Sequence, residues 1–293
     1  MRILIIGGTK FIGPHVARQF VQCGHDVLLY HRGETEADLP KSILHVRSPF
    51  AALPVLNFPH ELLAESFDAI VHMIAMGEAD SRAAMKAFRG RAERIVALSS
   101  GDVYRAYGRL TGTEPGPTEE GLLHEGSPLR SVLYPYRKQA KSVEDWVYDY
   151  EKVLVEREIL GHHELPGVIL RLPKVYGRDN NADLATVYGF RKQPQWRWTH
   201  GYVENVAAAV VLAATHPAAS GRIYNVGEAS TPTVAERLVG LPPSSIPDNE
   251  GEQYNFAQDI AYDTSRIRSE LGYAEHISYA EGLRRTLGRT IDQ

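Results

Sequence analysis

The sequence has little cysteine, no long apolar run and no excess of positive charge. Cys23 is the single cysteine in 293 residues, which excludes an intrachain disulfide and a cysteine metal cluster and makes a reducing, cytoplasmic setting the expectation. No apolar run approaches the roughly 18–20 residues of a membrane span, and residues 3–7 are too short for a signal-peptide core. The net charge of −4 gives no indication of a nucleic-acid partner. We therefore expect no metal and no membrane span, and the composition does not favour a nucleic-acid partner.

Apolar runs alternate with amphipathic stretches along most of the chain. The apolar runs predict strands at 2–6, 26–30, 43–46, 68–74, 94–99, 167–172 and 222–226. Helical patterns cover 12–23, 79–89, 137–160 and 202–215 and return within 263–293, whereas 105–130 and 241–256 have no clear period and are predicted to be loops. Continuous apolar strands separated by helices predict a parallel sheet covered on both faces, which is the doubly wound α/β architecture.

The segment GGTKFIG, residues 7–13, follows the first predicted strand and opens the first predicted helix. In that position Gly7 permits a sharp turn, and Gly13 lets the helix pack close to the sheet. The free N–H groups and the dipole of the helix N-terminus favour a pyrophosphate. The segment therefore predicts dinucleotide binding, with a purely structural turn as the alternative.

The end of the second predicted strand carries information about which dinucleotide binds. Sites that prefer NAD usually place an acidic residue there to bind the ribose hydroxyls. Here the strand ends in His31 and Arg32, and no carboxylate occurs before Glu34. An arginine fork pairs well with phosphate oxygens, and Lys10 adds a second positive charge near the same place. We therefore expect NADP rather than NAD, unless Lys10 and Arg32 are merely solvated surface charges.

Two further motifs indicate chemistry. The strand end ALSSGDVY supplies Ser99 and Ser100, and YPYRK supplies Tyr134 and Lys138 at the spacing Y-x-x-x-K. If a helix begins near Tyr134, residues four apart share one face, and the lysine ammonium favours the phenolate of a tyrosine whose reference pKa is about 10. Such a tyrosine can move a proton near neutral pH while Ser100 hydrogen-bonds the substrate oxygen. The trio fits hydride transfer between a carbinol and a nicotinamide.

Together these motifs resemble those of the extended short-chain dehydrogenase/reductase superfamily, in its NAD-dependent epimerase/dehydratase group. The resemblance covers nearly the whole chain, through HMIA at 72–75, LRLPKVYG at 170–177, GYVENVAAAV at 201–210, IYNVG at 223–227 and DTSRIRSELGY at 263–273. It implies a Rossmann-fold cofactor domain and a smaller C-terminal substrate lobe, with the active site between them. We assign 1–177 and 200–227 to the first, and 178–199 and 228–293 to the second.

The resemblance also implies roles for individual residues by position. It makes Ser100, Tyr134 and Lys138 catalytic. The expected cofactor contacts are Gly7, Gly8, Thr9, Lys10, Phe11, Ile12, Gly13, His31, Arg32, Ala75, Ser99, Tyr134, Lys138, Pro173 and Val175. The expected substrate contacts are Lys174, Tyr176 and Arg197, although 196–198 fits packed aromatic residues equally well.

The sequence departs from the family pattern in ways that bear on the activity. Lys10 replaces a glycine, and His31–Arg32 replaces the acidic ribose contact, which argues against NAD. The 4,6-dehydratases of the family share an Asp-Glu pair at two positions where this sequence has Gly101 and Asp102. A dehydratase of that type is therefore not expected. The segment 178–200 is shorter than expected for a family member that binds a whole nucleotide sugar, which argues against that class of substrate.

The expected activity is that of an NAD(P)-dependent oxidoreductase or epimerase. It would act at a carbinol or carbonyl carbon of a small molecule, such as a sugar or a sugar-nucleotide-like substrate, and both the substrate and the choice between reductase and epimerase stay open. A non-catalytic dinucleotide sensor or RNA-associated protein on the same fold is the alternative, because a basic fourth position in the glycine turn also resembles chloroplast RNA-binding relatives. A homodimer is expected, because family members often dimerise through helices of the Y-x-x-x-K region.

Overall fold

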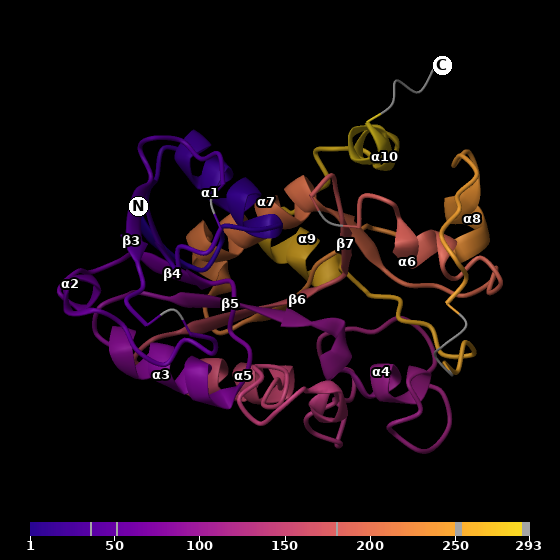
Figure 1. The fold of residues 1–293 in the computed structure, drawn as a ribbon, viewed down its shortest axis with the longest axis horizontal. Coiled ribbons are helices and arrows are strands. Elements are labelled where there is room, and N and C mark those ends of the chain that lie inside the picture. The colour runs from indigo at the N-terminus through magenta and orange to yellow at the C-terminus, as the bar shows by residue number, and fades with distance from the viewer. Residues whose placement is uncertain (36, 51, 180, 250–253, 289–293) are drawn as a thin grey trace.

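The computed structural model describes residues 1–35, 37–50, 52–179, 181–249 and 254–288. Within these ranges the chain forms a seven-stranded sheet with helices on both faces (Figure 1). The strand order is β3-β2-β1-β4-β5-β6-β9, and every neighbouring pair runs parallel. The doubly wound α/β fold predicted from the sequence is confirmed.

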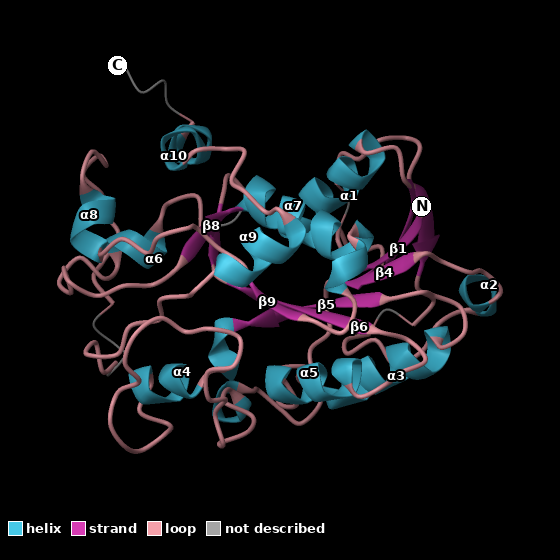
Figure 2. Ribbon diagram, turned by 180° about the vertical axis from the view of Figure 1, so that it is seen from behind, coloured by secondary structure: helices cyan, strands magenta, loops and turns pink. Residues whose placement is uncertain are grey.

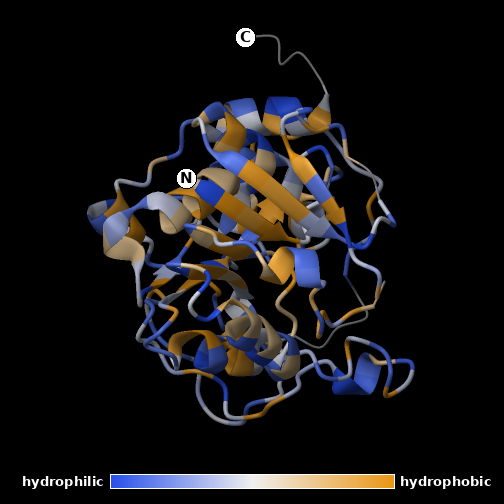
Figure 3. Ribbon diagram, turned by 90° about the vertical axis from the view of Figure 1, so that its left-hand side faces the viewer, coloured by the Kyte–Doolittle hydropathy of each residue, from blue (hydrophilic) through white to orange (hydrophobic). Residues whose placement is uncertain are grey.

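The strands of this sheet coincide with the predicted apolar runs. They are β1 (Arg2–Ile6), β2 (Asp26–His31), β3 (Leu44–Arg47), β4 (Ala69–His72), β5 (Ile95–Ser100), β6 (Gly167–Leu172) and β9 (Ile223–Asn225). Figure 3 shows hydrophobic residues along strands of this sheet, as expected for a parallel sheet that is covered on both faces, whereas the edge strand β3 is mostly exposed. A separate pair of short parallel strands consists of β7 (Lys174–Tyr176) and β8 (His200–Tyr202).

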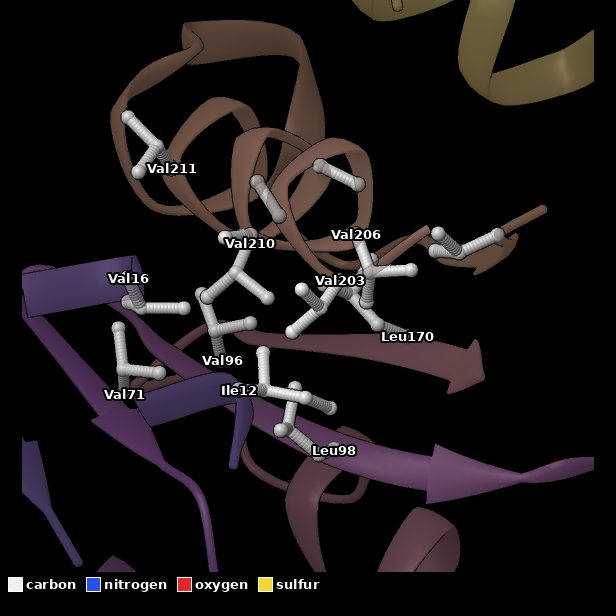
Figure 4. Close-up of a cluster of buried hydrophobic side chains, with 14 of the residues drawn as sticks. Ile12, Val16, Val71, Val96, Leu98, Leu170, Val203, Val206, Val210 and Val211 are labelled. Carbon is white, nitrogen blue, oxygen red and sulfur yellow. The ribbon is translucent and has the colours of Figure 1, made fainter. Parts of the chain in front are cut away.

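Helices α1 (Ile12–Gln22) and α7 (Val203–Thr215) cover one face of the sheet, and α3 (Glu78–Phe88) and α5 (Lys152–Leu160) cover the other (Figures 1 and 2). Figure 4 shows the core on the first face. There the side chains of the two helices meet those of the central strands: Ile12, Val16, Val203, Val206, Val210 and Val211 against Val71, Val96, Leu98 and Leu170. A second core lies under α3 and α5. These two apolar layers hold the sheet rigid beneath its carboxyl edge.

The remaining described elements are short. The helices are α2 (His60–Leu63), α4 (Arg105–Leu110), α6 (Ala185–Tyr188), α8 (Val234–Leu238), α9 (Ser265–Leu271) and α10 (Tyr279–Leu287), with 3₁₀ turns η1 (Gly101–Val103), η2 (Arg137–Gln139) and η3 (Pro217–Ala219). The prediction of a loop throughout 105–130 is therefore wrong for α4, whereas 241–249 has no helix or strand, as predicted. Residues 250–253 and 289–293 of the predicted segments lie outside the described part.

Across the described part of the chain, no helix is long and apolar enough to cross a membrane. The division into a cofactor domain and a substrate lobe stays a prediction.

The helix predicted over 137–160 is present only in its C-terminal third, as α5, and the earlier part of the prediction is wrong. Tyr134 precedes Pro135, and a following proline disfavours the helical backbone; the φ of Tyr134 is +57°. Asp145 then accepts backbone hydrogen bonds from within its own segment, which compete with a helix. The helix starts only after Glu151, whose carboxylate caps it.

Buried ion pairs fix the N-terminal end of α5. Arg171 of β6 donates two hydrogen bonds to Glu156, at 2.9 and 2.7 Å, and both side chains are almost fully buried. Arg130 pairs in the same way with Glu151. Since a buried charge without its partner is strongly destabilising, these pairs constrain how α5 meets the sheet.

The turn between β1 and α1 depends on Gly13. A Cβ atom on Gly13 would lie 2.2 Å from the Cα of Gly8, so a side chain has no room there. Gly7 and Gly8 have φ values of +87° and +97°, a conformation that glycine adopts without strain. The reason given for Gly13 from the sequence, close packing of the first helix, agrees with this geometry.

We expect Gly13→Ala to destabilise the fold. The new methyl group meets backbone rather than a flexible side chain, so the turn must move, at a cost of about 2 kcal/mol or more that outweighs the helix propensity of alanine. Urea denaturation should show this loss, while Gln22→Ala on the exposed end of the same helix changes stability by less than about 0.5 kcal/mol. An unchanged Gly13→Ala midpoint would contradict the packing argument.

His72, at the end of β4, is fully buried, and neither ring nitrogen has a hydrogen-bond partner among the described residues. Burial, with the nearby Lys152 charge, lowers its pKa to about 3. The unfolded chain, with a histidine pKa near 6.5, therefore binds more protons than the folded chain between these two values.

It follows that His72 makes the protein less stable as the pH falls below about 6.5. Between pH 7 and pH 5 we expect its contribution to the loss to be about 2 kcal/mol, which His72→Asn should remove from the pH dependence. Urea unfolding of both proteins at the two pH values measures this difference. Equal pH dependence in the two proteins would show that His72 has the same pKa in the folded and unfolded chain, which would contradict this account.

Candidate functional site

A cavity of about 330 Å³ lies over the carboxyl ends of β1, β2 and β4. In a parallel α/β sheet this edge is where ligands bind. The glycine turn forms its floor, and the loop after β2 forms one end. Of the predicted cofactor contacts it gathers Gly7, Gly8, Thr9, Lys10, Phe11, Ile12, His31, Arg32 and Ser99. Gly7 and Gly8 have positive φ values and carry no side chain, so a phosphate can approach the backbone there, and the residues present fit a dinucleotide pyrophosphate.

Other predicted cofactor contacts lie behind or beside this cavity. Gly13 packs under the turn, as described above. Ala75 is buried and its carbonyl oxygen accepts a hydrogen bond from Lys152. Val175 belongs to the core under α7, and Pro173 lines a neighbouring cavity.

The end of the cavity near the loop after β2 is rich in charge. Arg32 lies 2.9 Å from Glu34, and both line the cavity together with Lys10. His31 is buried, and its Nε2 lies 3.1 Å from Nδ1 of His45 on β3. Basic groups at this position suit a phosphate on the adenosine ribose.

A second, smaller cavity of about 100 Å³ adjoins the first, with Leu172 in both walls and the adjacent Ser99 and Ser100 on either side. It contains Ser100 from the predicted catalytic trio and Lys174 from the predicted substrate contacts. The ammonium of Lys174 lies 4.2 Å from the ring centroid of Trp198. The two cavities are therefore neighbours at the carboxyl edge of the sheet.

The other predicted substrate contacts lie elsewhere. Tyr176 is buried against Tyr202, outside both cavities. Arg197 is exposed, and its backbone N–H binds Asp259. Its neighbour Trp196 is buried in an aromatic cluster, which agrees with the alternative of packed aromatic residues for 196–198.

The structure does not bring Tyr134 and Lys138 to either cavity. Because the segment before α5 is not helical, the two residues do not share a helix face. The guanidinium of Arg137 covers the ring of Tyr134 at 3.7 Å, and the Tyr134 N–H binds Glu151. Lys138 is exposed. Their catalytic roles stay predictions that the geometry does not support.

Lys152, which sequence reasoning missed, occupies the place expected for the lysine. It lies at the first turn of α5, is buried, and lines the first cavity beside Ser99. Its ammonium donates to the carbonyl oxygens of Leu98, at 2.9 Å, and Ala75. Burial lowers the pKa of this ammonium, and the carboxylates of Asp102, Asp80 and Glu156 raise it. The signal was available, because YDYEK at 148–152 is a second Y-x-x-x-K.

Tyr148, the tyrosine of that second motif, lies outside both cavities, with the Arg137 guanidinium 4.5 Å from its ring centroid. A different tyrosine, Tyr136, reaches the second cavity. Its hydroxyl donates to Asp102 at 3.2 Å, and Tyr150 donates to the same carboxylate oxygen at 3.0 Å. Spacing along the sequence gives no signal for this arrangement, because it depends on how the irregular segment folds.

Asp102 is the buried carboxyl group of the second cavity. One of its oxygens accepts the two tyrosine hydrogen bonds, and the other has no hydrogen-bond partner among the described residues. Burial raises the pKa of Asp102, while the charges of Arg130 and Lys152 lower it. Burial and this carboxylate together raise the pKa of Tyr136. Both shifts favour the protonated forms, so Tyr136 can act as a hydrogen-bond donor in the second cavity, away from bulk water.

Known proteins resemble this chain over nearly all or part of its length. UDP-N-acetyl-alpha-D-glucosaminuronate decarboxylase of Bacillus cytotoxicus is 24% identical over 339 residues, covering 98% of this chain and 96% of the relative. A chloroplast stem-loop binding protein of Arabidopsis thaliana is 29% identical over 138 residues, covering 43% of this chain and 36% of the relative.

Among solved structures, UDP-glucuronic acid 4-epimerase from Bacillus cereus, in complex with UDP-glucuronic acid and NAD, has a TM-score of 0.68. It is 16% identical, and the match covers 98% of each chain. Likeness at this identity shows the fold. Residues 3–227 match the NAD dependent epimerase/dehydratase family. The glycine turn, the cavity at the sheet edge and this match agree, and the chain belongs to the NAD dependent epimerase/dehydratase family.

Proposed function

We propose that this protein is a dinucleotide-dependent oxidoreductase or epimerase that acts at a carbinol or carbonyl carbon. The observation that carries the proposal is that the two cavities adjoin: Leu172 lines both, Ser99 and the buried Lys152 line the first, and Ser100 lines the second. A cofactor in the first cavity and a substrate in the second would meet at this junction. A bound nicotinamide dinucleotide supplies a hydride acceptor or donor.

The side chains at the junction have distinct tasks in this proposal. Lys152 holds the ribose next to the nicotinamide and adds positive charge there. Ser100 hydrogen-bonds the reacting oxygen of the substrate. Tyr136 exchanges a proton with that oxygen, and Asp102 takes or returns the hydroxyl proton of Tyr136. This assignment replaces Tyr134 and Lys138, and it rests on which residues line the cavities.

A sugar nucleotide is the proposed class of substrate. The Bacillus cytotoxicus relative is named for a UDP-linked uronate, and the Bacillus cereus epimerase structure contains UDP-glucuronic acid. Lys174 lines the second cavity and offers a positive charge to a diphosphate or a carboxylate. A homodimer and a cytoplasmic setting stay predictions of the sequence.

NADP is the proposed cofactor in preference to NAD. Arg32 and Lys10 line the end of the cavity where the adenosine ribose would lie, and no carboxylate occupies the last position of β2. The neighbouring structures that contain NAD belong to proteins of 16–20% identity, so they leave this preference open.

The second candidate function is a dinucleotide sensor or RNA-associated protein without catalysis. The similarity to the chloroplast stem-loop binding protein over 43% of the chain favours it. The net charge of −4 does not favour RNA. Sugar-nucleotide turnover that depends on Lys152 would exclude this candidate.

We expect the purified protein, stripped of any copurifying cofactor, to bind NADPH more tightly than NADH. Arg32→Ala should weaken NADPH binding about tenfold and leave NADH binding nearly unchanged, because one charge-assisted phosphate contact contributes on the order of 1.5–3 kcal/mol. Titration by nicotinamide fluorescence measures both. Tighter NADH binding by the wild-type protein would contradict the NADP preference.

The two lysines can be compared directly. Lys152→Met should weaken NADPH binding about tenfold, because it removes a buried ammonium from the cavity wall, whereas Lys138→Met should have no effect. Thermal melting of both variants checks that the fold is retained. If only Lys138→Met lost NADPH affinity, the result would support the assignment made from the sequence, in which Tyr134 and Lys138 act together.

A further inference from the structure

The loop after β2 places a carboxylate against the arginine that would bind a 2′-phosphate. Nη2 of Arg32 lies 2.9 Å from Oε2 of Glu34, and both side chains line the first cavity. The side chains are 30% and 54% exposed. An ion pair this close to solvent is weak, so each partner can exchange the other for a ligand at small cost.

The backbone that carries this pair is held in place. The hydroxyl of Thr35 lies 2.7 Å from that of Thr9 in the glycine turn, and the Gly33 N–H donates to Nδ1 of His31 at 3.2 Å. Gly33 has a φ of +80°, which lets the loop reverse direction at the cavity. The loop therefore places Arg32 and Glu34 side by side at the cavity, and a ligand bound there interacts with both charges.

The surroundings of the pair favour an anion. Lys10 lines the same cavity and adds a second positive charge there. A ribose 2′-phosphate carries close to two negative charges at neutral pH. It would attract Arg32 and repel Glu34, so its binding requires the ion pair to open. A ribose 2′-hydroxyl makes no such demand.

We propose that Glu34 is a specificity-determining residue, which competes with the 2′-phosphate of NADP for Arg32 and so limits the preference for NADP over NAD. The inference rests on the proposed function, in that a dinucleotide must occupy the first cavity. With NAD the pair stays closed. With NADP, Glu34 turns toward solvent and Arg32 takes the phosphate. Glu34 thus lowers the affinity for NADP relative to NAD, although the other charges of the cavity favour NADP.

The test is the affinity of Glu34→Gln for NADPH and NADH, measured by nicotinamide fluorescence on the apo-protein. Removing the competitor should tighten NADPH binding by roughly two- to fivefold and leave NADH binding nearly unchanged. Glu164→Gln is the matched control. Glu164 also forms an exposed ion pair, with Arg89 at 2.9 Å, and its loss changes the net charge equally but far from the cavity. The control should bind both dinucleotides as the wild type does.

A double-mutant cycle distinguishes competition for Arg32 from general repulsion. If Glu34 acts by occupying Arg32, Glu34→Gln should gain little NADPH affinity in an Arg32→Ala background. An equal gain in NADPH affinity in both backgrounds would overturn the hypothesis that Glu34 competes for Arg32. So would a Glu34→Gln variant that loses NADH affinity and keeps its NADPH affinity, because Glu34 would then bind the ribose hydroxyls.

The outcomes also separate this inference from the proposed function. If the wild-type protein binds neither dinucleotide, the proposed function fails and this inference fails with it. If it binds both and Glu34→Gln changes neither affinity, the inference alone is overturned.

Discussion

The buried ion pair between Arg171 and Glu156 determines where α5 meets the sheet, and the site depends on that position. Arg171 lies on β6 and Glu156 on α5, and Ser99 of β5 donates to the same carboxylate at 2.6 Å. The pair therefore joins two strands and one helix at the carboxyl edge of the sheet. Lys152 lies one turn before Glu156, so the interaction that fixes the helix also fixes the buried ammonium of the cofactor cavity.

The same edge organises the rest of the site. The glycine turn follows β1, the charged loop follows β2, the two serines end β5, and Pro173 and Lys174 follow β6. Because all these strands are parallel, residues far apart in the sequence converge at one edge. Leu172 lines both cavities, and the adjacent Ser99 and Ser100 line one each. This places a binding surface for a dinucleotide next to a chamber with a buried carboxyl group and a tyrosine.

The sequence predicted the sheet well because both of its faces are buried, and burial on both faces makes the strands continuously apolar. The glycine turn could be predicted because position 13 has no room for a side chain and must be glycine, which makes the turn visible in the sequence. It failed in the segment before α5. Two Y-x-x-x-K spacings occur there, and spacing alone cannot show that Pro135 and the Glu151 cap delay the helix until Lys152. Asp102 and Tyr136 were missed because their contact depends on tertiary folding of an irregular segment.

The central claim is that the cavity at the sheet edge holds a nicotinamide dinucleotide with Lys152 at its ribose. A crystal structure of the protein with NADP bound tests it most directly. The account predicts the pyrophosphate against the backbone N–H groups of the turn at Gly7 to Ile12, the 2′-phosphate on Arg32, and the nicotinamide ribose within hydrogen-bond distance of Lys152. A dinucleotide bound with its ribose on Lys138, or bound outside this cavity, would contradict it.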